Sequence, residues 1–282
     1  MPRKEIMPTD KKKRATLKDI IQHYNLPVEW FRWANILFGY SCAMPNWNTL
    51  TYKQAVINKL KFFIKKMKIE KGQRGFEFGA GHYHAADYIS KNTGAEITAL
   101  NIVPQEVDYG KTLAKKNKLL KVKKQDLHDF EETGFDFGYA DGCLVHQERK
   151  QLKFFKAIFR ALRPGGIAII KEMVMFNIDD VSRKECELIK ETFMVGEYQE
   201  HEVVRATIKK SGLVILEEVE IPIWCYLWCL KEWVKAYRKN KKKLKKINKD
   251  RYRLDRHTYE NRFPPLLERG AFKVVMFICQ RP

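Results

Sequence analysis

From residue 74 onward, short apolar runs alternate with segments of helical periodicity. We predict five strands in this region, over residues 75–78, 96–101, 119–122, 136–140 and 166–172. The segments between them predict helices over 85–91, 104–116 and 149–162. Alternation of this kind is typical of an α/β fold with a parallel, doubly wound sheet. Any ligand is then expected at the carboxyl ends of the strands, next to the first one.

The pattern continues with two helices and two strands toward the C-terminus. Helices are expected over 182–192 and 200–211, a sixth strand over 213–221 and a last strand over 272–279. Before the alternating region, Thr16 and Asp19 suit the capped start of a first helix that runs through Tyr24. A second helix with an aromatic face is expected over 29–37, and a long third helix from about Thr51 to Met67.

These elements divide the chain into five parts. Residues 1–15 are a basic tail, 16–72 an N-terminal helical region and 73–221 the α/β core; 222–270 are a helical cap and 271–282 carry the final strand. The cap begins with a dense aromatic stretch, residues 224–233, and continues into a lysine-rich stretch, residues 235–249. We expect the aromatic part to cover the site and the lysines to face solvent, and an ordinary solvated helix face is the alternative for the lysines.

A glycine-rich turn follows the first predicted strand. Gly79 and Gly81 let the backbone turn sharply and approach a ligand closely, and the next helix directs its free N–H groups at that turn. A dinucleotide fingerprint would place a third glycine where His84 stands and an acid where Asn101 ends the second strand. The Glu77-x-Gly79-x-Gly81 pattern is instead similar to the first motif of S-adenosylmethionine methyltransferases. A structural turn with glycines for packing is the alternative.

The net charge and the cysteine pattern indicate what kind of partner and which redox compartment to expect. The 282-residue chain has a formal net charge of +20, which predicts an anionic partner: a membrane surface, a nucleic acid or an acidic substrate. Its six cysteines form no CxxC pair and no zinc-type spacing, so we expect buried thiols, no metal and a cytoplasmic, reducing compartment. The uncharged run 221–230 is too short to span a bilayer, although a peripheral membrane contact is compatible with the charge.

Four stretches together resemble the cyclopropane-fatty-acid synthase-like and sterol C-methyltransferase group. The first is the N-terminal series 23–26, 39–43, 49–50, 54–55 and Lys59; the others are 99–102, 163–166, and Tyr226 with Leu230 and Trp233, together with the ending 277–282. The resemblance covers nearly the whole chain. It implies a class I methyltransferase fold, mostly parallel with an antiparallel last strand, and S-adenosylmethionine as cofactor. It also implies that the N-terminal helices close over cofactor and acceptor.

The resemblance assigns the cofactor site position by position. Tyr40 and Ser41 would close over the methionine end, Asn101 would begin the ribose-contacting turn, and Asp126 would accept from the adenine amino group. The full set that it implies is Tyr40, Ser41, Glu77, Gly79, Ala80, Gly81, Asn101, Ile102, Glu106, Asp126 and Leu127. Each of these residues has a purely structural role as its alternative; Asp126, for example, could cap a turn.

The chain departs from the synthases where they hold a bicarbonate ion. The cysteine and tyrosine positions are Cys42 and Tyr226, but the glutamate position is Val145 and the histidine position is Lys171. Valine cannot accept a hydrogen bond, which disfavours ring formation. We therefore predict simpler methyl transfer to a lipid-like or other hydrophobic small molecule, with carbon favoured as the acceptor atom. Candidate bases or orienting groups are His146, Glu172, Asp141 and Tyr226; His146 is preferred because its unperturbed pKa lies near neutral pH.

Two other functions remain open from the sequence. One is a small-molecule amine N-methyltransferase, because an amine loses its proton without a strong base. The other is a non-catalytic protein on a decayed methyltransferase fold, associated with a membrane or a nucleic acid. For the basic cap we expect anionic lipid, and we rank nucleic acid below it because no RNA- or DNA-binding signature accompanies the charge.

Overall fold

A seven-stranded sheet forms the centre of the computed structural model, which describes residues 16–147, 150–176, 184–186, 189 and 198–282. In sheet order the described strands are β3 (Leu120–Lys124), β2 (Glu96–Asn101), β1 (Arg74–Phe78), β4 (Phe135–Asp141), β5 (Leu162–Met175), β7 (Phe272–Gln280) and β6 (Val214–Ile221). Strand β7 runs antiparallel to both neighbours, and the pairs among β1 to β5 are parallel. The expected α/β class and antiparallel last strand are confirmed.

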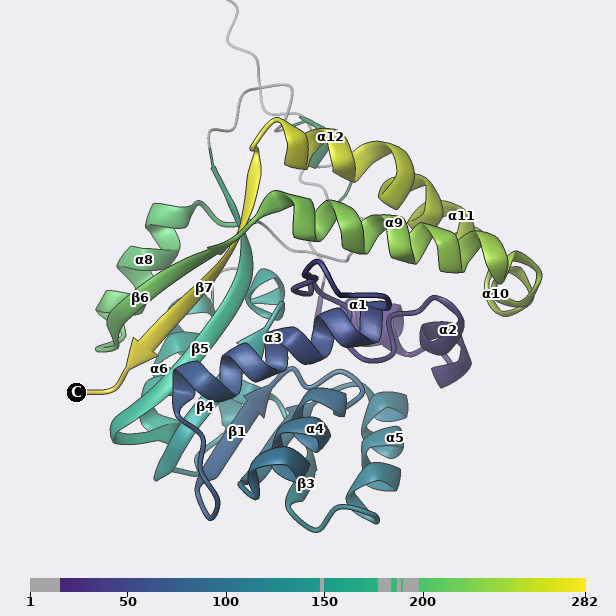
Figure 1. The fold of residues 1–282 in the computed structure, drawn as a ribbon. Coiled ribbons are helices and arrows are strands. Elements are labelled where there is room, and N and C mark those ends of the chain that lie inside the picture. Colours follow the sequence, from purple (N-terminus) through teal and green to yellow (C-terminus); the bar gives the residue numbers. More distant parts are fainter. Residues whose placement is uncertain (1–15, 148–149, 177–183, 187–188, 190–197) are drawn as a thin grey trace, which may run out of the picture.

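Helices cover both faces of the sheet (Figure 1). They include α3 (Tyr52–Met67), α4 (His84–Thr93), α5 (Pro104–Ala114), α6 (Gln151–Ala161) and α8 (His201–Lys210). Because strand side chains alternate between faces, Phe137 and Tyr139 of β4 join the core cluster under α3 and α4. Their neighbour Ala140 joins a second cluster with α6 and α8.

Glycines in the central strands make room for aromatic rings from the strand alongside. A Cβ on Gly75 would lie 2.1 Å from the ring of Phe137, and a Cβ on Gly138 would lie 2.1 Å from the ring of Phe76. Each contact is far shorter than a van der Waals distance, so any larger residue would push β1 and β4 apart. This packing fixes the register at the strand whose carboxyl end carries the glycine turn.

Two short helices precede α3. The expected capping box is present: Thr16 and Asp19 bond reciprocally at the start of α1 (Leu17–Tyr24). Helix α2 (Val28–Trp33) ends before the predicted Leu37, because Asn35 takes a left-handed φ of 63° that breaks the helix. Helix α3 begins at a second capping box, made by Thr51 and Gln54.

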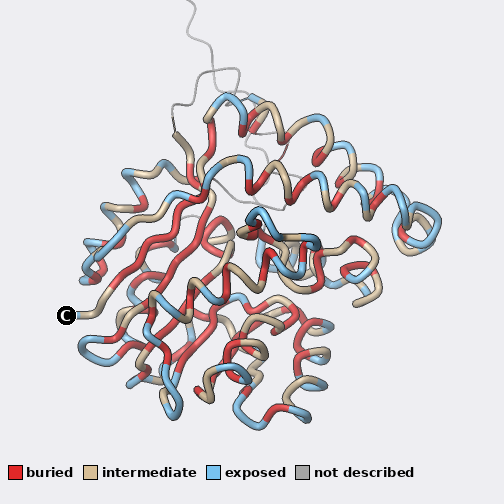
Figure 2. The backbone as a smooth tube through the Cα atoms, in the orientation of Figure 1, coloured by how far each residue is buried: buried red, intermediate tan, exposed pale blue. Residues whose placement is uncertain are grey.

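The C-terminal cap is a chain of helices laid over α1, α2 and α3 (Figure 1). It comprises α9 (Ile223–Lys239), α10 (Lys241–Ile247), α11 (Lys249–His257), the π-helical turn η4 (Thr258–Arg262) and α12 (Phe263–Glu268). Buried and exposed positions alternate along it, as Figure 2 shows. The aromatic side chains Tyr226 and Trp233 point into the core, whereas Lys241, Lys242 and Lys243 are exposed, as the sequence predicts.

Three predicted elements differ from the structure or fall partly outside the described residues. The turn expected at 163–166 lies within β5, where the pairing with β4 jumps from Leu162 to Ile167 and Gly165 takes a φ of 77°. Helix α6 begins at Gln151 rather than at 149, which is outside the described residues. The helix expected over 182–192 also falls largely outside them. No helix in the described part of the chain combines the length and apolar character needed to cross a bilayer.

Candidate active site

The glycine turn after β1 adopts the left-handed conformations that its sequence favours. Gly79 and Gly81 have φ of 73° and 49°, and Tyr83 is left-handed at the start of α4. A Cβ on Gly79 would lie 2.7 Å from the Cβ of Cys143, so the turn packs closely against the loop after β4. The amide of Ala80 donates to the carbonyl of Leu100 at 3.0 Å, which ties the turn to β2.

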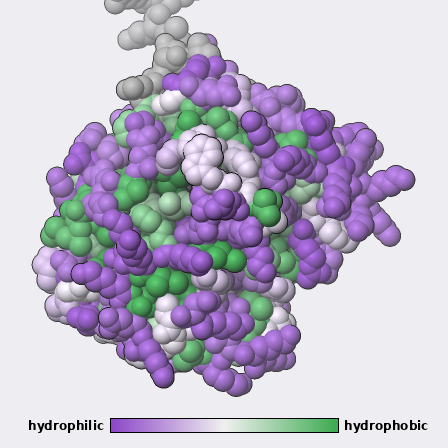
Figure 3. All heavy atoms as spheres, in the orientation of Figure 1, coloured by the Kyte–Doolittle hydropathy of each residue, from purple (hydrophilic) through white to green (hydrophobic). Residues whose placement is uncertain are grey.

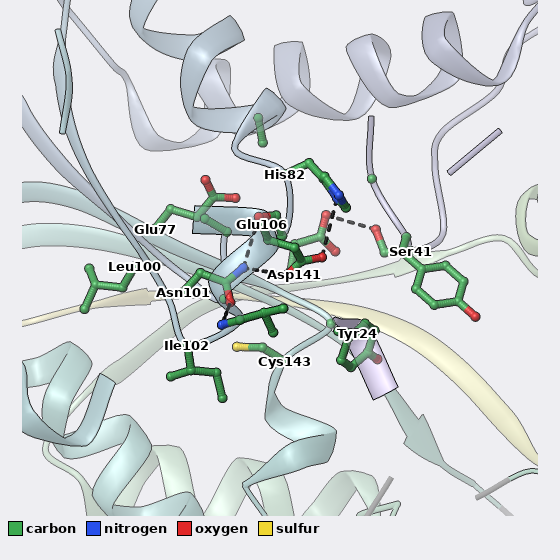
Figure 4. Close-up of a pocket in the computed structure, with 18 of the residues that line it drawn as sticks. Tyr24, Ser41, Glu77, His82, Leu100, Asn101, Ile102, Glu106, Asp141 and Cys143 are labelled. Atoms are coloured by element: carbon green, nitrogen blue, oxygen red, sulfur yellow. Dashed lines mark hydrogen bonds and ion pairs between the residues drawn. The ribbon is translucent and has the colours of Figure 1, made fainter. Parts of the chain in front are cut away.

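A cavity of about 420 Å³ opens over this turn, at the carboxyl ends of β1, β2 and β4 (Figure 4). Every residue that the sequence assigns to the cofactor lines it: Tyr40, Ser41, Glu77, Gly79, Ala80, Gly81, Asn101, Ile102, Glu106, Asp126 and Leu127. The apolar side chains of α1 and α2 close the opposite wall, among them Ile20 and Phe31. The cavity is within the size range of small-molecule sites.

The end of β2 carries a buried polar cluster, shown in Figure 4. The side-chain amide of Asn101 donates to Oε2 of Glu106 at 2.7 Å and to the carbonyl of Gly81 at 3.0 Å. Burial raises the pKa of Glu106 to about 7. His82 Nδ1 lies 3.4 Å from Glu106 Oε1, but burial lowers the pKa of this histidine to about 3, so the contact joins neutral imidazole to a carboxyl. The cluster can accept hydrogen bonds from hydroxyl groups.

Two further carboxyls mark the ends of β1 and β3. Glu77 is buried, its Oε2 has no hydrogen-bond partner, and burial raises its pKa to about 8. Oδ1 of Asp126 accepts from the amide of His128 at 2.9 Å, capping the short turn η1 (Leu127–Asp129). Asp126 therefore has the turn-capping role expected as its alternative, and it also lines the cavity.

These residues fit S-adenosylmethionine. The unpartnered Glu77 oxygen suits an ammonium group, the Asn101 and Glu106 pair suits ribose hydroxyls, and Asp126 suits an exocyclic amine. The left-handed glycine turn, which glycine adopts without steric strain, lets the chain pass close to a bound molecule. The cavity volume also matches a ligand of this size.

A second, smaller cavity of about 60 Å³ adjoins the first. Three of the predicted catalytic residues line it, namely His146, Glu172 and Tyr226, whereas Asp141 lines the large cavity. Residues that line both cavities mark a junction between them: Tyr24, Tyr40, Ser41, Gly142 and His146. His146 is thus the predicted catalytic residue that faces both spaces.

Asp141 is held between two buried lysines. Lys59 Nζ lies 2.5 Å from its Oδ2 and Lys171 Nζ lies 2.7 Å from its Oδ1. Burial would raise the pKa of Asp141, but Lys171 and Lys59 outweigh it and lower the pKa to about 2. A carboxylate stabilised to this degree is a poor base near neutral pH. Its place between the lysines indicates a structural and electrostatic role.

The other three candidates differ in what they can do. Burial raises the pKa of Tyr226 well above its usual value, so its hydroxyl remains a hydrogen-bond donor. Burial also raises the pKa of Glu172, to about 7, although its Oε2 accepts from the amides of Leu144 and Val145 at 2.8 and 3.3 Å. Those amides open the turn η2 (Leu144–His146), so Glu172 also fixes the turn that presents His146.

Two residues of the site were missing from the sequence prediction. Tyr24 at the end of α1 lies with its hydroxyl 3.2 Å from Nε2 of His146. Lys59 donates to Ser41 Oγ at 2.8 Å as well as to Asp141. The sequence could have indicated Lys59, because it stands beside the apolar face of the predicted helix 51–67 and a lysine is rarely buried there without a charged partner. Tyr24 falls in the stretch 23–26 that carries the family resemblance, but the resemblance assigned it no role, and only tertiary packing brings it to His146.

Comparison with known proteins places this arrangement in a family. The sequence model of the mycolic acid cyclopropane synthetase family matches residues 11–261, most of the chain. The chain belongs to this family. The membership confirms the resemblance drawn from the sequence and the expectation of S-adenosylmethionine as cofactor.

Individual relatives include two kinds of lipid methyltransferase. A sterol 24-C-methyltransferase from Debaryomyces hansenii is 26% identical over 209 residues, covering 71% of this chain and 54% of the relative. A probable fatty acid methyltransferase from Mycobacterium tuberculosis is 23% identical over 220 residues, covering 76% of this chain and 51% of the relative. The chain thus spans about half the length of the curated relatives that it matches.

Solved structures share the whole fold. The cyclopropane synthase MmaA2 from Mycobacterium tuberculosis superposes with a TM-score of 0.85 at 16% identity, covering 94% of this chain and 99% of that one. A coclaurine N-methyltransferase superposes with a TM-score of 0.76 at 15% identity, covering 96% of this chain and 84% of that one. At these identities the likeness shows the fold, which confirms the predicted class I methyltransferase architecture.

Proposed function

We propose that this protein is an S-adenosylmethionine-dependent methyltransferase that methylates a lipid-like or other hydrophobic small molecule, with carbon as the favoured acceptor atom. One observation carries the proposal. The cavity lined by all the predicted cofactor residues adjoins a second cavity lined by candidate proton acceptors, and His146 lies at the junction. The lipid methyltransferases among the relatives support the class of acceptor.

The cofactor would supply a methyl group already activated on a sulfonium, so the protein mainly has to orient the acceptor and exclude water. Glu77, Asn101, Glu106 and Asp126 are placed to hold its polar groups. Ile20 of α1, Phe31 of α2 and Tyr226 of the cap line these cavities and would help to exclude water from them. Such exclusion protects the reacting groups from water.

Proton removal after attack by an alkene carbon would fall to His146 or Glu172. Asp141 is committed to two lysines, and the high pKa of Tyr226 makes its hydroxyl a donor. Lys171 is also committed, since its ammonium is paired with Asp141. At the two positions where the synthases hold bicarbonate, an apolar Val145 and a paired Lys171 therefore support simple methyl transfer over ring closure.

The test is methyl transfer from radiolabelled S-adenosylmethionine to fractionated lipid extracts, with a panel of hydrophobic amines in parallel. Label in a lipid fraction at carbon supports the proposal. Label only in the amines would reassign the protein as an N-methyltransferase. Absence of both transfer and saturable cofactor binding would contradict both enzyme functions and favour a non-catalytic role.

We also propose that the basic cap binds anionic lipid. Lys241, Lys242 and Lys243 are exposed on α10, and Figure 3 shows hydrophilic side chains covering the projecting end of the cap. Trp224, 51% exposed at the start of α9, supplies an amphipathic ring of the kind that sits at membrane interfaces. Sedimentation with vesicles containing phosphatidylserine should exceed sedimentation with neutral vesicles. Tighter, salt-labile retention of RNA on filters would contradict the lipid assignment.

A further inference from the structure

A buried polar network joins the C-terminal cap to the end of α1. Arg251 of α11 donates through Nη1 to Nδ1 of His23 at 2.7 Å. Asp255, one turn further along α11, accepts from Arg251 Nε at 2.6 Å and from the hydroxyl of Tyr237 at 2.7 Å. Asp255 and Tyr237 are fully buried. The cap is therefore bonded to α1 by directional polar contacts as well as by apolar packing.

The first arm of this network leads to His146. Burial, together with the nearby Arg251, lowers the pKa of His23 to about 2, so His23 is neutral and its Nδ1 can accept from the guanidinium. The next residue is Tyr24, whose hydroxyl lies 3.2 Å from His146 Nε2. A contact made by the cap thus fixes the residue beside the one that touches His146.

The second arm leads to Tyr40. The ring of Tyr237 packs edge-on against that of Tyr259, with the centroids 5.6 Å apart, in the π-helical turn η4 of the cap. The hydroxyl of Tyr259 is in turn hydrogen-bonded to the hydroxyl of Tyr40. The ring of Tyr40 packs 5.6 Å from that of Trp233 and 6.4 Å from that of Tyr24. Tyr24 and Tyr40 both line the two cavities, so both arms end at the junction between them.

Stability alone does not account for such a network. A buried ion pair must overcome the desolvation of both charges, and apolar replacements of similar volume are often as stable or more so. A second ion pair on the same helix, Arg253 with Asp250, lies exposed at 3.7 Å and touches neither cavity. Helix α11 thus carries one buried pair aimed at the site and one exposed pair that serves as a matched comparison.

We propose that Arg251 and Asp255 are positioning residues: through His23 they hold Tyr24 against His146, and with Tyr259 and Tyr40 they set the junction where cofactor and acceptor meet. The proposal rests on the proposed function, because the positioned groups are those of the methyl-transfer site. It gives helix α11 of the cap a role in catalysis although its residues line neither cavity.

The kinetic test compares Arg251→Met and Asp255→Asn with Arg253→Met and Asp250→Asn. The buried-pair variants should lower kcat about tenfold or more, as misplacement of a catalytic group does, while the exposed-pair variants stay near wild type. Arg251→Lys should recover part of the loss. Because Tyr24 lies on the same path, adding Arg251→Met to Tyr24→Phe should lower kcat little further. Independent, additive losses would overturn the proposal.

A second measurement needs neither acceptor nor turnover. Amide hydrogen exchange over residues 17–24 should accelerate in Arg251→Met and in Asp255→Asn, but not in Arg253→Met. Unchanged exchange over residues 17–24 in both buried-pair variants would overturn the positioning role of Arg251 and Asp255, even if the enzyme is active. If exchange accelerates in the buried-pair variants while the wild-type protein transfers no methyl group, the positioning role is supported and the proposed function is contradicted.

Discussion

The two cavities are built from the chain in different ways. The polar wall of the large cavity comes from consecutive strand ends: Gly79 to Gly81 after β1, Asn101 at the end of β2 and Asp126 after β3. The small cavity gathers Tyr24 from α1, Glu172 from β5 and Tyr226 from α9. The polar wall of the large cavity is thus the product of successive βα units, whereas the small cavity exists only once the N-terminal helices and the cap have packed together.

The electrostatics of the two cavities differ as well. In the large cavity Glu77 and Glu106 have raised pKa values because burial opposes their charge, and an incoming cation or hydroxyl would offset that burial. In the small cavity the charged groups already have partners inside the protein, since Glu172 accepts from two backbone amides and Lys171 is paired with Asp141. The first cavity is thus prepared for a polar ligand, whereas the second is prepared to hold reacting groups in fixed positions.

The largest expected effect on catalysis comes from substituting His146, at the junction of the two cavities. His146→Ala should lower kcat by about a hundredfold to ten-thousandfold, the usual contribution of a general base, while cofactor affinity stays near wild type. Steady-state kinetics with calorimetric titration of S-adenosylmethionine would separate the two quantities. The control is His201→Ala, which removes a histidine of α8 that lines neither cavity. Equal loss in both variants would remove His146 from the mechanism.

Removal of the Asp141 carboxylate, which Lys59 and Lys171 share, should affect the stability of the protein more than its catalytic rate. Asp141→Asn leaves two buried lysines without their counter-ion and should lower the free energy of unfolding by about 3–5 kcal/mol. Chemical denaturation measures this effect. Asp108→Asn, which breaks an exposed pair with Lys111, should change the free energy by less than about 1 kcal/mol. A similar small change for Asp141→Asn would show that the lysines are not buried as charges.

The same variant has a pH signature. The folded pKa of Asp141, about 2, lies below its unfolded value, so its stabilisation is present above the unfolded pKa and is lost as pH falls toward 2. Glu172 has the opposite sign: its stabilisation is present below its unfolded pKa and is lost as pH rises through about 7. Asp141→Asn should flatten the acid limb of the stability profile and leave the neutral limb unchanged.

The glycine turn offers a matched pair of substitutions. Gly79→Ala places a Cβ 2.7 Å from Cys143 and should weaken cofactor binding at least about tenfold, because left-handed strain is relieved by displacing the turn. Gly72→Ala introduces the same kind of strain at a φ of 84°, with nothing within 4 Å and outside the cavity. Titration calorimetry should therefore find weakened binding in the first variant alone. Comparable weakening in both would trace the effect to global destabilisation.

The smallest effect concerns the cap surface. Lys242→Ala should weaken binding to anionic vesicles about fivefold, the usual share of one lysine near a charged membrane. Lys116→Ala, an exposed lysine just after α5, should leave vesicle binding unchanged. Equal losses would indicate that net charge, and not the cap, attracts the membrane.

The difference between the cavities also explains what the sequence could predict. Gly79, Asn101 and Asp126 each follow a recognisable strand, so local pattern and family resemblance place them on one cavity wall. The stretch 23–26 also carries the resemblance, but it gave Tyr24 no role, since Tyr24 meets His146 only through a contact spanning more than a hundred residues. Helix α2 was predicted too long because the aromatic periodicity of residues 29–37 does not reveal the left-handed φ at Asn35 that ends the helix. Non-local packing and single-residue backbone choices are the parts that sequence pattern leaves open.

The most direct test of the account is a titration of S-adenosylmethionine into the purified protein, followed by transfer of its labelled methyl group to a fractionated lipid extract. We expect saturable binding at one site, weakened at least about tenfold in Gly79→Ala, and label on a carbon of a lipid product, formed at least about a hundredfold more slowly in His146→Ala. Saturable binding without transfer to any lipid would contradict the proposed acceptor. Failure to bind the cofactor would contradict the assignment of the large cavity itself.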